Sequence, residues 1–160
     1  MSASKGTASG RTTGRPVVGS GARAIARLAR QLEKALESQE LTLPQYRVLS
    51  VLADGSSASS ALASRLAVSP PSMTAVIDGL SARGYVDRRP DPDDRRRLTL
   101  LLTATGKKAL RAAEAAVAAR LEEVGSYLED PARATEALAA IEVWNHALDN
   151  FRETRVARQP

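Results

Sequence analysis

The residues best suited to chemistry form a charged run, Asp91-Pro92-Asp93-Asp94-Arg95-Arg96-Arg97, between two extended segments. Adjacent arginines on an exposed loop suit the negative potential of a narrow DNA minor groove, because the guanidinium group is planar and always charged. An aspartate within a residue or two, such as Asp94, can hold an arginine in an extended pose. The run therefore favours nucleic-acid contacts by Arg95, Arg96 and Arg97. The alternative is a solvated turn whose charges pair with one another.

A second polar group lies on a helix that is predicted to begin after Ser69. Ser69-Pro70-Pro71 is a favourable helix start, because both prolines fall where amides have no intrahelical partner. The inward stripe is Met73, Val76, Ile77 and Leu80, which leaves outward Pro71, Ser72, Thr74, Ala75 and Asp78. Small hydroxyls suit phosphates or base edges, and Pro71 or Ala75 could meet a thymine methyl. The alternative is a three-helix core that binds nothing.

Other kinds of site find little support in the residue types. The chain has no cysteine and a single histidine, His146, so thiol chemistry and a multi-histidine metal site are excluded. No nucleophile–base pair or phosphate-binding glycine loop is visible, and Gly19-Ser20-Gly21 is only linker composition. We therefore expect no enzyme and no cofactor. The apolar runs are too short to span a bilayer and the first residues do not form a signal peptide, which predicts a cytoplasmic protein without a membrane partner.

The charge of the chain is unevenly distributed. The chain has 160 residues and a net charge of +5; residues 1–60 and 61–110 carry +4 each, whereas residues 111–160 carry −3. A basic body followed by an acidic, alanine-rich region points to a polyanionic partner, most often nucleic acid. Ordinary surface charge is the alternative. A hydrophobic content of 43% is enough for a real core.

Helical periodicity places these groups on a short series of elements. An amphipathic helix is expected from Ala22 to Gln39, and Thr42-Leu43-Pro44-Gln45 has the form of a capping box for a helix that Gly55 ends. A short helix from Ser59 to Ala67, closed by Val68, precedes the helix that begins after Ser69 and ends at Gly84.

After Gly84 the apolar residues no longer recur at helical spacing, and their pattern becomes that of extended strands. Residues 85–89 and 98–102 are predicted to form a β-hairpin with the charged run at its tip. Thr103 should cap a long helix over residues 104–129, with Leu110, Val117, Leu121, Val124 and Leu128 on one side. Asp130-Pro131 should begin the last helix, which bears Leu138, Ile141, Trp144, Leu148 and Phe151. The predicted fold is mainly α with a small β-hairpin wing: a winged helix-turn-helix core plus N- and C-terminal dimerisation helices.

An ordered set of motifs resembles the MarR (multiple-antibiotic-resistance regulator) family of bacterial transcription factors. The set comprises Leu41 to Gln45, Leu62-Ala63 with Val68-Ser69, Leu80 with Gly84-Tyr85-Val86, Arg88-Arg89, the Asp91 to Arg96 wing and Leu102 to Gly106. The resemblance covers residues 42–106 in detail. It implies a homodimer on a pseudo-palindromic operator, with Arg96 as the wing arginine, Asp94 as the acid that steadies it, and Ser69 to Thr74 at the start of the recognition helix.

The resemblance also implies an effector, and two departures limit it. Family members commonly respond to small phenolic or anionic molecules; plausible lining groups here are Tyr46, Arg23, Arg27 and Arg47. A position that is often arginine in the family is Ala75 here, so base readout must depend on smaller side chains. A threonine often found at the start of the short helix is Ala58, which leaves capping to Ser57 or Ser59.

The apolar stripes outside the winged core independently predict a dimer, because they exceed what so small a domain can cover. A monomeric bundle in which these helices cover one another is the alternative. We expect a flexible basic tail at 1–20, a helical dimerisation region at 21–40 and 104–153, a DNA-binding domain at 41–103 and a C-terminal tail at 154–160. The predicted function is a sequence-specific regulator of transcription, most simply a repressor. Its alternatives are a sequence-tolerant architectural DNA-binding protein and a winged helix used for protein contacts.

Overall fold

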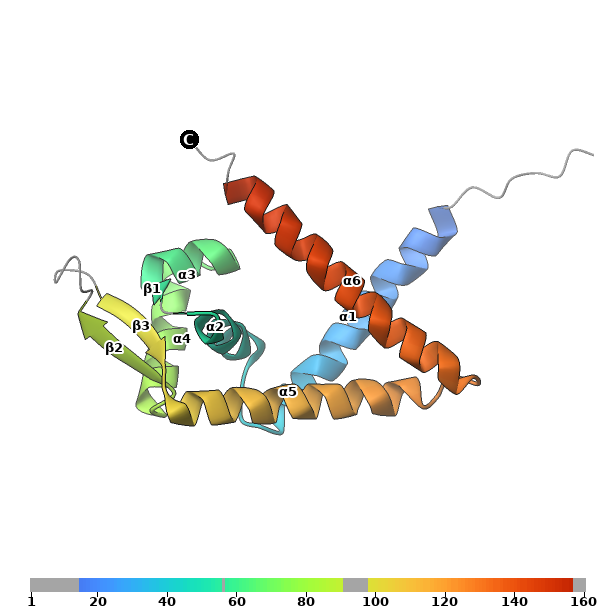
Figure 1. The fold of residues 1–160 in the computed structure, drawn as a ribbon, viewed down its shortest axis with the longest axis horizontal. Coiled ribbons are helices and arrows are strands. Elements are labelled where there is room, and N and C mark those ends of the chain that lie inside the picture. The colour runs from blue at the N-terminus through green and yellow to red at the C-terminus, as the bar shows by residue number, and fades with distance from the viewer. Residues whose placement is uncertain (1–14, 56, 91–97, 157–160) are drawn as a thin grey trace, which may run out of the picture. The chain divides into compact units, whose positions relative to one another are not determined.

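The computed structural model describes residues 15–55, 57–90 and 98–156. The elements in order are α1 (Arg15–Glu37), α2 (Leu43–Ala53), β1 (Ser57–Ala58), α3 (Ser59–Leu66), α4 (Pro70–Ala82), β2 (Val86–Pro90), β3 (Leu98–Leu102), α5 (Ala104–Gly125) and α6 (Pro131–Val156) (Figure 1). The chain divides into two units at Arg30 and Gln31, inside α1. The mainly helical fold with a small β wing is confirmed.

Side-chain caps start three of the helices where the sequence predicts them. The amide of Gln45 donates to Thr42 Oγ1 at 3.4 Å, and the Thr42 amide donates to Gln45 Oε1 at 2.9 Å, which completes the capping box of α2. Ser69 accepts a hydrogen bond from the amide of Ser72 at the start of α4. Asp130 Oδ1 accepts one from the amide of Ala132, at 2.9 Å, in the first turn of α6.

The ends of three helices differ from the prediction. α1 begins at Arg15, inside the predicted tail, because Pro16 is tolerated in a first turn and Gly19 and Gly21 weaken a helix without ending it. Similarly, α6 continues to Val156, inside the predicted C-terminal tail. α5 ends at Gly125, before the predicted residue 129, and Ser126 serves as its C-cap. Residues 1–14 and 157–160, the rest of both tails, lie outside the described residues.

The start of α3 also corrects the prediction. Its N-cap is Ala58, which offers no side-chain hydrogen bond, so neither Ser57 nor Ser59 caps it. Ser57 instead belongs to the short strand β1, which sequence patterns missed because two residues show no periodicity. α3 ends at Leu66, one residue before the predicted Ala67, which is its C-cap with a left-handed φ of 52°. The Ala67 amide donates to the Ser64 carbonyl and the Val68 amide to the Ala63 carbonyl.

The wing is an antiparallel three-stranded sheet in the order β1-β3-β2. Val86 pairs with Leu102 and Pro90 with Leu98, so the hairpin is confirmed with its first strand one residue later than predicted. Ser57 pairs with Leu100 on the other side of β3. The sheet is therefore linked to both the helix-turn-helix and the beginning of α5.

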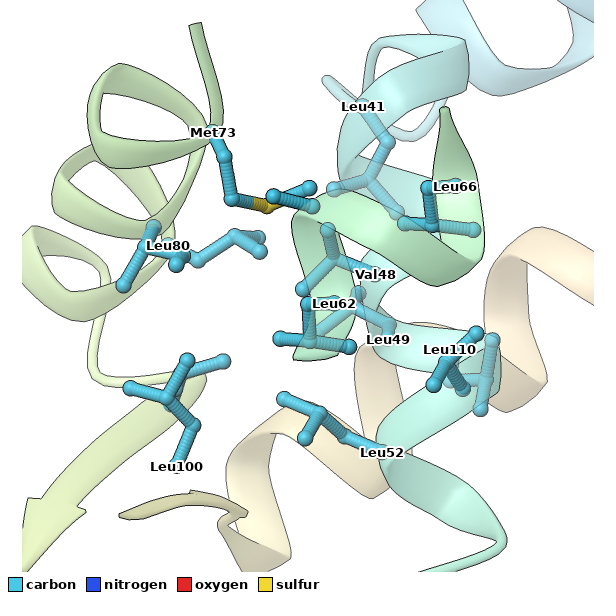
Figure 2. Close-up of a cluster of buried hydrophobic side chains, with 14 of the residues drawn as sticks. Leu41, Val48, Leu49, Leu52, Leu62, Leu66, Met73, Leu80, Leu100 and Leu110 are labelled. Carbon is cyan, nitrogen blue, oxygen red and sulfur yellow. The ribbon is translucent and has the colours of Figure 1, made fainter. Parts of the chain in front are cut away.

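One apolar core holds the winged region together. Figure 2 shows side chains of α2, α3, α4, β3 and α5 pointing toward one another, among them Leu49, Leu62, Met73, Leu80 and Leu100. Leu49, Leu62 and Leu80 are fully buried. Since every element of the helix-turn-helix contributes to this cluster, the orientation of α4 is fixed by its packing against α2, α3 and β2.

The junction between the sheet and α5 is close-packed around a glycine. A Cβ atom on Gly106 would lie 2.2 Å from the Tyr85 carbonyl oxygen, so only glycine fits there. Next to it, Thr103 Oγ1 donates to the Gly84 carbonyl at 2.7 Å and accepts from the Gly106 amide at 2.9 Å. Gly84 has a φ of 68°, as expected for the residue that ends α4.

None of the helices in the described part of the chain combines the length and the apolar character needed to cross a membrane.

Candidate nucleic-acid interface

The outward face of α4 is the best-defined part of the candidate site. Met73, Ile77 and Leu80 are buried and Val76 is half-buried, as predicted. The five residues predicted to face outward are all exposed: Pro71, Ser72, Thr74, Ala75 and Asp78. The structure thus brings Pro71, Ser72 and Thr74 together with Ser69 at the first turns of one helix.

The hydroxyl groups at this helix start are already partly engaged. Ser69 Oγ lies 2.8 Å from Ser72 Oγ, and Thr74 Oγ1 donates to the Pro70 carbonyl at 3.1 Å. A hydroxyl has two acceptor lone pairs in addition to its donor, so each can still accept from an incoming group. These side chains form a small, uncharged surface that is suited to close approach.

The predicted wing residues lie outside the described residues. These are Asp94, Arg95, Arg96 and Arg97, within residues 91–97. The pairing of Pro90 with Leu98 shows that the segment connects two adjacent, antiparallel strands. At the base of this hairpin, Arg89 Nε donates to Asp87 Oδ2 at 2.9 Å.

Two arginines next to α4 form contacts that the sequence did not predict. Arg88 of β2 forms an ion pair with Asp78 of α4, so the strand and the helix are joined through charged side chains. Arg83, at the end of α4, donates to the Glu40 carbonyl and to Tyr85 Oη at 2.9 Å, and its guanidinium carbon lies 4.6 Å from the centre of the Tyr85 ring. Glu40 has a left-handed φ of 55°, which this contact helps to hold. No spacing rule relates residues 40 and 83, so a local pattern could not reveal this link.

The predicted effector-lining residues belong to two different units of the chain. Tyr46 packs half-buried against the core, and Arg47 Nη2 donates to the Leu66 carbonyl at 3.3 Å, across to α3. Arg23 and Arg27 are exposed on α1, in the other unit. Two open hollows, of about 340 and 470 Å³, are lined by other residues, the first beside Asp78 and Arg88 and the second between α3 and α4.

Large apolar side chains are exposed along α6. Trp144 is 70% exposed and Phe151 61%, and Ile141 and Leu148 share their side of the helix by spacing. Leu138, earlier in the helix, is also exposed. Exposure of this kind within one helix is typical of a surface that binds another protein surface.

Comparisons with known proteins agree with this geometry. Residues 39–97 match the MarR family. The chain is 40% identical over 94 residues to an uncharacterized HTH-type transcriptional regulator of Mycobacterium leprae (strain TN), an alignment that covers 58% of this chain and 66% of that protein. The chain thus spans slightly less than two thirds of the length of this curated relative.

Solved structures show the same fold over most of the chain. A MarR-family transcriptional regulator from Rhodococcus sp. RHA1 superimposes with a TM-score of 0.67 at 20% identity, covering 89% of this chain and 96% of that one. CouR from Rhodococcus jostii RHA1, crystallised with p-coumaroyl-CoA, gives 0.62 at 22% identity and covers 82% and 87%. The similarity therefore extends beyond the residues 39–97 of the family match to the helices on either side.

Proposed function

We propose that this chain, which is similar to MarR-family transcriptional regulators, is a homodimeric, sequence-specific repressor that a small molecule releases from its operator. The observation that carries the proposal is the setting of α4. Its apolar side is anchored in the core while Ser69, Pro71, Ser72 and Thr74 remain at its accessible start. A helix held in this way beside a hairpin fits the major groove, and the hairpin tip can reach the adjacent minor groove.

The exposed side of α6 supports a dimer. Burial of Trp144 and Phe151 against a second copy would remove a large apolar area from water, with a gain of about 25 cal/mol for each Å². We assign residues 21–40 and 104–153 to the dimerisation region and 41–103 to the DNA-binding domain. Two recognition helices would then meet successive major grooves of a pseudo-palindromic site, about 34 Å apart.

Effector release follows from that geometry. Small molecules that change the separation of the two recognition helices would weaken binding to half-sites of fixed spacing. CouR is a neighbour in fold whose crystal structure contains p-coumaroyl-CoA, a molecule with both a phenolic and an anionic part. We propose an effector of the phenolic or anionic class.

The function is tested through the wing arginine. The operator is first isolated by pull-down of genomic fragments and footprinting, and binding is then followed by fluorescence anisotropy at fixed salt. We expect Arg96→Ala to weaken operator binding by about fivefold to 150-fold, because losing one arginine contact to DNA costs about 1–3 kcal/mol. Arg133→Ala, an exposed arginine at the start of α6, is the matched control and should leave affinity unchanged. Equal affinity of Arg96→Ala and wild type would contradict the wing assignment.

A second function, sequence-tolerant coating of DNA, is favoured by one observation. Pro70–Ala82 contains no lysine or arginine, so α4 offers few strong base contacts. The ratio of operator affinity to random-DNA affinity separates the two functions, together with a salt slope of about −0.9 per neutralised phosphate. We expect a ratio of at least a thousand; a ratio near one would establish coating instead.

A further inference from the structure

Asp78 is the only charged residue of α4, and it is exposed on the side of the helix next to β2. An acid on a helix that approaches DNA is repelled by phosphates, so its presence needs a reason. Its side chain is 57% exposed, and its partner Arg88 is 40% exposed, so the ion pair is accessible from solvent. Both residues also line an open hollow of about 340 Å³.

The pair offers hydrogen-bond acceptors and donors side by side. In the major groove a guanine presents two acceptors, O6 and N7, and the cytosine paired with it presents one donor, the N4 amino group. A carboxylate complements the amino group, and a guanidinium complements the two acceptors. Arg88 keeps unused N–H donors after pairing, because a guanidinium has five.

We propose that Asp78 and Arg88 act together as a specificity determinant that reads one G·C base pair in each half-site, Asp78 through cytosine N4 and Arg88 through guanine. The inference rests on the proposed function, since it assumes that α4 enters the major groove. In this chain the Asp78–Arg88 ion pair, formed between α4 and β2, would supply a base contact in place of the arginine that the family often has at the position of Ala75.

The neighbouring charges are consistent with this role. Asp87, which also lines the hollow, is paired with Arg89 at 2.9 Å. Arg88 therefore pairs with Asp78 and not with Asp87, and the carboxylate of Asp78 fixes the direction of the Arg88 guanidinium. Ala75 lies one helical turn before Asp78 and is too short to block the approach of a base edge.

The test is the base preference of the full-length protein, measured on an operator library in which each position is varied. Wild type should prefer G·C at one position per half-site. Asp78→Asn should reduce the preference for cytosine at that position by about tenfold and move it toward adenine, which asparagine recognises through N6 and N7. Arg88→Gln should lower the preference for guanine at the same base pair, and every other position should keep its wild-type profile.

Two further variants make the result decisive. Asp54→Asn breaks a second exposed ion pair, with Arg65, and should not alter any base preference. Asp78→Glu keeps the carboxylate and should keep cytosine as the favoured base, which separates the contact from a general effect on folding.

Three outcomes would overturn the inference. If Asp78→Asn leaves the base-preference profile unchanged, the ion pair only links α4 to β2 and does not read a base. If Asp78→Asn binds every sequence more tightly by the same factor, Asp78 only repels phosphate. If wild type itself selected no sequence, the proposed function would fail as well, whereas a selective wild type with an unaffected variant would overturn this inference alone.

Discussion

Leu62 in α3 and Trp144 in α6 are both large apolar residues on helices, yet the first is completely buried and the second is 70% exposed. The contrast extends to their surroundings: α2, α3 and α4 share one core, whereas α6 carries its apolar residues outward. The winged region is thus held by its own contacts, while α6 leaves an apolar surface exposed. Stability and assembly should accordingly respond to different substitutions.

The largest effect on stability is expected for a buried residue of the winged core. We expect Leu62→Ala to lower the free energy of unfolding by about 2–5 kcal/mol, because it leaves a cavity among close-packed neighbours. Leu148→Ala in α6, at a leucine that is 57% exposed, is the matched control and should cost far less in the monomer. Urea denaturation, at a protein concentration too low for dimerisation, measures the free energy of unfolding of both variants. Similar losses would show that α6 is as tightly packed as the core.

The next effect concerns assembly. Trp144→Ala should raise the dimer dissociation constant about thirtyfold, or about 2 kcal/mol, because buried tryptophans dominate interface energies. Val143 is just as exposed but lies on another side of the helix, so Val143→Ala should change the dissociation constant by less than about threefold. Sedimentation velocity over a concentration series measures the constants. Equal effects of the two substitutions would place the interface elsewhere.

The smallest effect sharpens the boundary between the two regions. Thr103→Val keeps the shape of the side chain but removes the hydroxyl that caps α5 and contacts the Gly84 carbonyl. We expect a loss of about 1 kcal/mol in thermal unfolding, typical of an N-cap. Thr105→Val, two residues later and exposed, is the comparison and should be nearly neutral. If both cost the same, the β-branched side chain and not the cap is responsible.

Much of the winged core could be predicted because its signals are local. The capping box at Thr42, the double proline after Ser69 and the left-handed Gly84 each determine a helix boundary within a few residues. The inward stripe of α4 follows from 3.6-residue periodicity, so the exposed face and its hydroxyls were predictable as well. Whether those hydroxyls contact DNA stays a prediction.

What the sequence missed depends on contacts between distant residues. Arg83 reaches Glu40 across 43 positions, and β1 exists only because Ser57 and Ala58 pair with β3. The early start of α1 escaped notice because the Gly and Ser residues around Val17 and Val18 suggested a loop. The pairing of Arg88 with Asp78 joins a strand to a helix, and no periodicity within either element indicates it.

The absence of a side chain at Gly106 determines how movement passes through the molecule. Because the backbone of α5 lies against the Tyr85 carbonyl there, the helix has no room to slide past the segment that joins α4 to β2. Any tilt imposed on the far end of α5 must turn the wing with it. In the proposed dimer, a small displacement between the two copies at the far end of α5 would therefore reach the DNA-binding surface as a rotation.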